Sequence, residues 1–330
     1  MTPAWIVVLA LPAAVAWAAI AALRGSRFAA KLADVPNERS LHAAPVPRVG
    51  GIGLMVAALP VALWLADSAI AVLLACAAAL VVVSAADDVR SLPISVRLPA
   101  HVAAATVAIL AIGAPSGAHE GLGIVEAAVA IVAIVWMANL YNFMDGSDGL
   151  AGGMALIGFG VLALAAAASR QWPLAMACAA IASAAAGFLP WNFPPARVFF
   201  GDAGSVPLGF LAAALGLHGA LTSAWPIAFP ILVFSPFIAD ATVTLARRVA
   251  RRERFWRAHR SHYYQRLVLA GWSRSRLALS AYALMIGAAA AAFVFRAAEP
   301  RMQLAIIAGW VALYAALFIA IERRVRAAAT

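Results

Sequence analysis

Long apolar runs are the feature that most limits what this chain can fold into. The first lies between Trp5 and Leu23, and comparable runs recur along the whole sequence. A helix needs about 20 mostly apolar residues to cross the hydrocarbon core of a bilayer. Composition agrees, because 65% of the residues are hydrophobic and only 12% are charged, whereas a soluble domain carries about 25% charged residues. The sequence therefore predicts an all-α polytopic membrane protein rather than a soluble domain.

The length rule predicts eleven membrane spans, two of them short. They are 4–24, 50–66, 69–86, 98–114, 123–140, 150–168, 172–189, 206–222, 225–246, 276–296 and 302–321. No basic residue precedes the first run, so we expect a retained helix with its N-terminus outside rather than a signal peptide.

The basic residues support this orientation. Of the 24 Lys and Arg residues, all but Arg170, Arg296 and Arg301 then lie in or beside the inner segments, which is the bias that cytoplasmic loops show. The net charge of +10 follows from the same bias, so no nucleic-acid partner is expected. We expect one integral membrane domain, 1–330, with a cytoplasmic C-terminus and the inner loops 25–49, 87–97, 141–149, 190–205 and 247–275.

A polar segment separates two apolar runs at Asn139–Leu150, where the sequence is NLYNFMDGSDGL. If its backbone is helical, Asn142, Asp145 and Asp148 share one face, because residues three apart are neighbours on a helix. Oxygen ligands gathered in this way suit Mg²⁺. A polar turn without a ligand is the competing interpretation, and the other inner loops decide between the two.

Further acids oppose the positive charge of the inner loops. Asp87 and Asp88 follow an apolar run at the negative end of a helix dipole, where like charges cost stability unless a cation or a hydrogen-bond donor offsets them. Asp202 lies between glycines in FFGDAGS, which suits either a helix N-cap or a metal ligand.

One acid, Asp240, lies inside the ninth expected span. An acid at that depth is a functional candidate. Arg247 and Arg248, about two turns away, offer a simpler role as its ion-pair partners.

Basic residues of the first and last inner loops suit phosphate. The first loop carries Arg39, His42 and Arg48, and the 247–275 loop carries His259 and His262 among many arginines. The histidine pair is a poor cation site because the surrounding charge is positive. His and Arg both donate hydrogen bonds to phosphoryl oxygens, although such arginines also face anionic lipid in many membrane proteins.

All of these motifs fall on the inner side of the membrane. Acids that gather a divalent cation beside bases that hold phosphates form the usual arrangement for phosphoryl transfer. We therefore expect an active site in a cleft on the cytoplasmic face.

The motifs resemble those of the polyprenyl-phosphate N-acetylhexosamine-1-phosphate transferase superfamily, glycosyltransferase family 4. The resemblance covers residues from about 36 to 267 in the family's order. It rests on PRVGG (47–51), Asp87-Asp88, Asn139–Gly149 followed by LAG, FGDAGS (200–205) and HRSHYYQR (259–266). The form of the last motif and the eleven spans are more similar to enzymes that start O-antigen or other surface glycans than to the phospho-MurNAc-pentapeptide branch. Ser147, Pro99 and His101 depart from the family pattern.

The resemblance implies a reaction. A UDP-N-acetylhexosamine gives its sugar 1-phosphate to undecaprenyl phosphate, with Mg²⁺ or Mn²⁺ as cofactor, and UMP is released. Such an enzyme is a multi-pass protein of the bacterial inner membrane and starts lipopolysaccharide O-antigen or cell-wall polysaccharide synthesis. The sequence leaves the sugar open, and it leaves the assembly open too, with a homodimer as one option.

Carried over by motif, the resemblance also implies a role for each polar residue. Asp202 would be a metal ligand with Asn142 beside it. The catalytic residues would be Asp87, Asp88, Asp145, His259 and His262. The substrate-binding residues would be Arg48, Arg97, Asn139, Asp148 and Arg260. Direct attack by the lipid phosphate is favoured over a phosphorylated aspartate, because the phosphate is already an oxyanion.

Two other classes of function compete with this one. A transporter or flippase of lipid-linked sugars predicts charges within several spans or interrupted helices in two related halves. A structural membrane subunit leaves the acids of the inner loops unexplained. Because the acids gather at one surface, the sequence favours the transferase.

Overall fold

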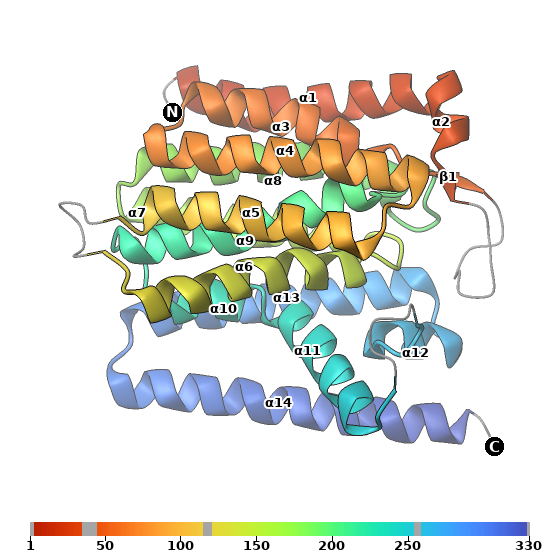
Figure 1. Cartoon of the computed structure of the whole chain (residues 1–330). Helices are drawn as coiled ribbons and strands as arrows, with labels where there is room; N and C mark the ends of the chain where they lie inside the picture. Colours follow the sequence, from red (N-terminus) through yellow and green to blue (C-terminus); the bar gives the residue numbers. More distant parts are fainter. Residues whose placement is uncertain (1–2, 35–44, 115–120, 254–258, 329–330) are drawn as a thin grey trace.

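The computed structural model describes residues 3–34, 45–114, 121–253 and 259–328, which form a bundle of helices (Figure 1). The helices are α1 (Pro3–Arg24), α2 (Arg27–Lys31), α3 (Gly50–Trp64), α4 (Ser68–Arg90), α5 (Ile94–Ile112), α6 (Ile124–Phe143), α7 (Leu150–Ala168), α8 (Trp172–Asn192), α9 (Asp202–Leu221), α10 (Ala228–Val233), α11 (Ser235–Ala250), α12 (Tyr263–Leu269), α13 (Arg274–Ala297) and α14 (Pro300–Ala327). Two short strands, β1 (Ala33–Asp34) and β2 (Val46–Pro47), pair antiparallel. Arg39 and His42 lie outside the described residues.

Most of these helices are long and apolar enough to cross a membrane. In the described part of the chain nine meet that standard, and α3 is apolar but only 15 residues long. The protein is therefore an all-α multi-pass membrane protein. The count of eleven spans and the orientation of the chain stay predictions.

The expected span 225–246 is not one helix. It breaks at Phe234 into α10 and α11, and α11 leaves the bundle at an angle toward α14 (Figure 1). The cause is local: Pro236 has no amide hydrogen to donate to the carbonyl of Leu232. The hydroxyl of Ser235 donates to that carbonyl instead, at 2.6 Å.

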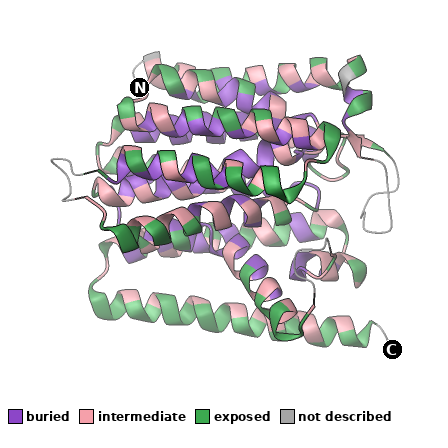
Figure 2. Ribbon diagram, in the orientation of Figure 1, coloured by how far each residue is buried: buried purple, intermediate pink, exposed green. Residues whose placement is uncertain are grey.

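The core lies around α7, α8 and α9, which are the most buried of the long helices (Figure 2). At the opposite extreme is α14: all 28 of its residues are described and none is buried. Its apolar side chains are suited to lipid rather than to protein contacts.

Several helices run past the expected ends of the spans. The expected 69–86 helix continues to Arg90, the 123–140 helix continues to Phe143, and the helix expected from 206 begins at Asp202. Hydropathy locates only the apolar part of a helix, so it misses polar terminal turns. As a result, several of the acids lie on helix ends rather than in loops.

Candidate functional site

The first inner loop is fixed to the start of α9. The amide groups of Gly50 and Gly51 donate to the carbonyls of Phe199 and Phe200, at 2.9 and 2.8 Å. A Cβ at Gly51 would collide with the backbone of Gly204, so glycine is required for α3 and α9 to approach so closely. This contact places Arg48 beside the acids at the start of α9.

Asp88 caps α9 from the end of α4. Its carboxylate accepts from the amides of Asp202 and Ala203, at 3.2 and 3.1 Å, and lies 3.8 Å from the guanidinium of Arg48. The N-cap position itself is Gly201. The N-cap interpretation of Asp202 is therefore wrong, and its carboxylate is left for other contacts.

The negative charge of Asp87 is offset by a different pair of hydrogen-bond donors. It accepts from the amide of Leu92, at 2.6 Å, and from Arg97, at 2.9 Å. The same Arg97 nitrogen lies 3.9 Å from the carboxylate of Asp202. These donors, together with the amides bound by Asp88, offset the cost of two adjacent acids at a helix end.

Asp145 lies beyond the end of α6, which stops at Phe143. The condition for a shared helix face with Asn142 and Asp148 is therefore not met. The pKa of Asp145 is raised well above its ordinary value, first by burial and then by the negative charges of Asp202 and Asp88. Asp87, Asp88, Asp145 and Asp202 thus form a group of acids, called here the carboxylate cluster.

The cluster fits the chemistry of a hard divalent cation. Its donors are carboxylate oxygens, and Asn142 supplies a carboxamide oxygen that already accepts from Ser205 at 2.8 Å. Among the described residues, no group of three or more His, Cys, Asp or Glu side chains is close enough to hold a metal alone. Mg²⁺ does not need such a cage, since it usually takes one or two carboxylates and completes its shell with water and phosphate.

Two of the expected site residues have other contacts. Asp148 is buried and accepts from the amide of Ala196 at 2.9 Å and from Arg274 at 3.2 Å. Asn139 donates to the carbonyl of Val135 at 2.7 Å and lies 3.3 Å from the ring of His101. Asp148 thus joins α13 to the loop before α9, and Asn139 joins α6 to α5.

Residues 259–266, called here the histidine segment, are fixed by Asp240. Its carboxylate accepts from the amides of Tyr263 and Tyr264, at 2.9 and 3.0 Å. The alternative in which Asp240 pairs with Arg247 or Arg248 is wrong, because Arg247 binds Glu322 of α14 and Arg248 binds Glu253. Proximity in sequence misled the prediction, since the amides that Asp240 binds come from more than 20 residues away.

The two histidines stack on each other beside Asp240. Their ring centroids are 5.0 Å apart, and the Nδ1 atom of His262 is 3.4 Å from Asp240 but forms no hydrogen bond. Burial lowers the pKa of His259 to about 4, with help from the charges of His262 and Arg248, so His259 is neutral at pH 7.

Tyr264 joins the histidine segment to the carboxylate cluster. Its hydroxyl donates to the carbonyl of Phe143 at 2.9 Å, and a Cβ at Gly146 would collide with it. Burial raises its pKa, and the charges of Asp240 and Asp145 add to the rise. Sequence reasoning gave Tyr264 no role, although the residue lies within the HRSHYYQR motif. Arg260 of the same segment is exposed.

The structure therefore brings together Asp87, Asp88, Asp145 and Asp202 with Arg48 and Arg97, and it places the histidine segment against the loop that carries Asp145. Comparison with known proteins shows what such a chain is similar to. Residues 70–220 match the family model described as glycosyl transferase family 4. The match runs from α4 through α9, so it contains the whole carboxylate cluster and ends before the histidine segment.

Named relatives extend further along the chain. It is 27% identical to a probable undecaprenyl-phosphate N-acetylglucosaminyl 1-phosphate transferase of Bacillus subtilis (strain 168), over 83% of this chain and 80% of the relative. It is 29% identical to the undecaprenyl-phosphate alpha-N-acetylglucosaminyl 1-phosphate transferase of Yersinia pestis, over 73% and 71%. It is also 34% identical to a phospho-N-acetylmuramoyl-pentapeptide-transferase of Moorella thermoacetica, over 52% of each chain. Because both branches appear, the choice of the surface-glycan branch stays a prediction.

Proposed function

We propose that this protein transfers an N-acetylhexosamine 1-phosphate from a UDP-sugar to undecaprenyl phosphate. An oxygen of the lipid phosphate forms a bond to the phosphorus that bears the sugar, the bond from that phosphorus to the UMP phosphate breaks, and UMP leaves with the electron pair. The observation that carries the proposal is the convergence of Asp88, Asp145 and Asp202 from three parts of the chain, beside Arg48 and Arg97. The names of the relatives support the same reaction class.

Each side of the cluster has a proposed task. Asp202 and Asn142 would hold Mg²⁺ or Mn²⁺, which when bound neutralises charge on the diphosphate. Arg48 and Arg97 are bound to acids yet partly exposed, at 36% and 39% of the side-chain surface, so both can also meet phosphate. Asp87 is the proposed acceptor of any proton left on the lipid phosphate, because its carboxylate lies beside Arg97, which can meet the same phosphate.

The histidine segment would hold the diphosphate or the sugar. His259 is neutral, so its ring donates one hydrogen bond without adding charge. Arg260 is exposed on the same segment and supplies a cation for phosphate. We also propose that the product starts O-antigen or another surface polysaccharide, and that the enzyme works in the bacterial inner membrane.

The test is a transfer assay with the purified full-length protein in detergent, undecaprenyl phosphate, Mg²⁺ and a panel of UDP-N-acetylhexosamines. Release of UMP should require the lipid and the metal, and should vanish in Asp202→Ala. The matched control is Asp67→Asn, because Asp67 caps α4 away from the cluster, accepting from the amide of Ile70.

A flippase of lipid-linked sugars is the alternative, since the break between α10 and α11 is an interrupted helix of the kind that transporters use. Folded protein that releases no UMP with any sugar but moves lipid-linked sugars across vesicles would replace our proposal with this one. EDTA separates the two classes, because it should abolish transfer and has no evident effect on a flippase.

A further inference from the structure

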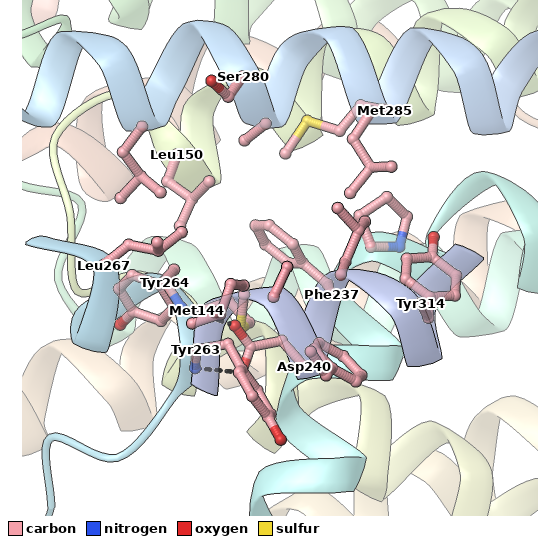
Figure 3. A pocket seen from close by; sticks show the side chains of 18 of the residues that line it. Met144, Leu150, Phe237, Asp240, Tyr263, Tyr264, Leu267, Ser280, Met285 and Tyr314 are labelled. Carbon is pink, nitrogen blue, oxygen red and sulfur yellow. Dashed lines mark hydrogen bonds between the residues drawn. The ribbon is translucent and has the colours of Figure 1, made fainter. Parts of the chain in front are cut away.

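An apolar pocket of about 470 Å³ lies between α11, α12, α13 and α14, outside the carboxylate cluster (Figure 3). Its walls include Met285 of α13 and Phe237 of α11, and the side of α14 that faces them. Within α14 no residue is buried, so the pocket is bounded on one side by a helix that packs only loosely on the bundle. In a membrane-spanning protein, a lipid acyl chain that enters such a space gains the contacts that an empty apolar pocket forfeits.

The lining of the apolar pocket on α14 is apolar over most of its length and basic at one end. Its α14 lining runs from Leu313 through Leu317 and Ile321 to Arg324, a distance of about 16 Å at 1.5 Å per residue. The guanidinium of Arg324 lies 5.9 Å from the ring centroid of Trp272. A ligand that fits this pocket is therefore apolar over most of its length and anionic at one end.

A second, polar pocket of about 150 Å³ adjoins the first at Tyr263, which lines both. Among its charged lining residues are four arginines and two glutamates, so its charge is positive: Arg247, Arg248, Arg251, Arg266, Glu253 and Glu322. The ring of Tyr263 stacks on Phe318 with centroids 4.1 Å apart, and the guanidiniums of Arg247 and Arg266 each lie 5.4 Å from it. Apolar and basic surfaces thus meet at one side chain.

We propose that the two pockets form one binding site for a bilayer phospholipid with an anionic head group. An acyl chain lies between α13 and α14, and the phosphate is bound at the end marked by Arg251 and Arg324. A free phosphate would leave the apolar pocket empty, and a zwitterionic lipid would not use its positive charge. Of the described residues, those lining either pocket include none of the carboxylate cluster. Met144, next to Asp145, lines the apolar pocket, so the proposed site adjoins the loop of the cluster but is distinct from the acids proposed to meet the acceptor phosphate.

A lipid bound at this site would contact the residues that hold the histidine segment in place. The apolar pocket is lined in part by Asp240, Tyr263 and Tyr264. The hydrogen bond from the Tyr263 amide to Asp240 therefore joins two lining residues (Figure 3). A bound acyl chain would pack against the same side chains that fix the segment. We therefore expect anionic phospholipid to raise the transfer rate, a consequence that rests on the proposed function, whereas the binding itself does not.

The test measures binding by native mass spectrometry of the full-length protein in a neutral detergent. Phosphatidylglycerol and phosphatidylcholine with the same acyl chains are titrated separately, and undecaprenyl phosphate is added as competitor. We expect phosphatidylglycerol to be preferred, and Arg324→Gln and Arg251→Gln each to reduce that preference about fivefold. The neighbouring Arg323→Gln and Arg252→Gln, whose parent residues line neither pocket, should leave it unchanged.

A second pair of variants tests the acyl-chain pocket without altering charge. Ser280→Trp places a large ring in the pocket that Ser280 lines, and should reduce binding of phosphatidylglycerol. Leu279→Trp, at an exposed neighbouring position, should not. Equal binding of the two phospholipids, equal losses in the paired controls, or displacement of phosphatidylglycerol by undecaprenyl phosphate would each overturn the proposal. Lipid preference without UMP release would contradict the transferase and leave the lipid site standing.

Discussion

The carboxylate cluster and the histidine segment belong to one candidate site but are held in different ways. The cluster lies where α4 and α9 meet, and α9 is among the most buried helices. Asp88 links those two helices by accepting from two amides at the start of α9. The histidine segment is fixed by Asp240 and Tyr264, and behind it lies α14, which contributes no buried residue.

This difference follows the demands of the two parts. Charges that must act on a metal and two phosphates require fixed positions, which buried helix ends supply. A segment that closes on a sugar must let substrate enter, and such elements come from the less stable parts of a fold. The comparison therefore predicts that changes in the cluster abolish activity, while changes behind the histidine segment reduce it by degrees.

The largest effect should come from Asp88→Ala. The change removes the acceptor for two amides at the start of α9 and frees Arg48 from a partner. We expect transfer to fall about 10²–10³-fold, with a loss of about 1 kcal/mol in unfolding free energy from the missing cap. Assays of UMP release and thermal unfolding in detergent measure the two effects. Activity within tenfold of the wild type would show that Asp88 only caps the helix.

Asp240→Ala should have the next largest effect. It leaves the amides of Tyr263 and Tyr264 without their acceptor, and a buried unsatisfied group costs about 1–3 kcal/mol. We expect kcat/KM to fall about 10–100-fold, which corresponds to that cost, and hydrogen exchange at those two amides to accelerate. Asp67→Ala is the matched control, because it removes a carboxylate that accepts an amide elsewhere in the bundle. Unchanged exchange at Tyr263 and Tyr264 would contradict the role of Asp240.

The acids of the candidate site show how far the sequence could predict the structure. Apolar runs were sufficient for an all-α membrane protein, because hydropathy depends on composition alone. The Asp87-Asp88 pair could be recognised from its unfavourable place at a helix end. Its partners could not, since the amides that Asp88 binds belong to Asp202 and Ala203, more than 100 residues away.

Two local errors have clear physical causes. A hydropathy window averages over Ser235 and Pro236, so it joins α10 and α11 into one span. Charge matching along the sequence offered Arg247 or Arg248 as a partner of Asp240, whereas folding brings Glu322 to Arg247 and places backbone amides against Asp240. A search for opposite charges cannot identify backbone donors, because every residue except proline carries an amide N–H.

Glu322→Gln should have a smaller effect than either change above. Glu322 binds Arg247 and Arg266, with one Arg266 contact at 2.9 Å, and so ties α14 to α11 and α12. The groups are partly exposed, and such pairs contribute up to about 1 kcal/mol. We expect kcat/KM to fall up to about fivefold. The difference in kcat/KM between wild type and variant should become smaller as the salt concentration is raised, because salt screens the ion pairs. A loss beyond 100-fold would place α14 in the catalytic machinery.

His259→Gln should have the smallest effect on the free energy of unfolding, and that effect should be confined to acidic pH. Burial and the charges of His262 and Arg248 lower the pKa of His259 to about 4, below the ordinary value of about 6.5. The unfolded chain therefore binds a proton between those values that the folded chain rejects, so stability is present above about pH 6.5 and declines as pH falls toward 4. His259 is partly exposed, so solvent screening keeps the difference below about 1 kcal/mol.

Thermal unfolding at pH 7.5 and pH 5 should show a larger drop for the wild type than for the His259→Gln variant. Hydrogen exchange at the Tyr263 amide then shows where the drop arises. Faster exchange at pH 5 than the intrinsic pH dependence explains, in the wild type only, would mean that protonation loosens the histidine segment while the carboxylate cluster stays in place. An equal drop in both proteins would mean that the two parts of the site unfold together, and that the histidine segment is as firmly held as the helix ends beside it.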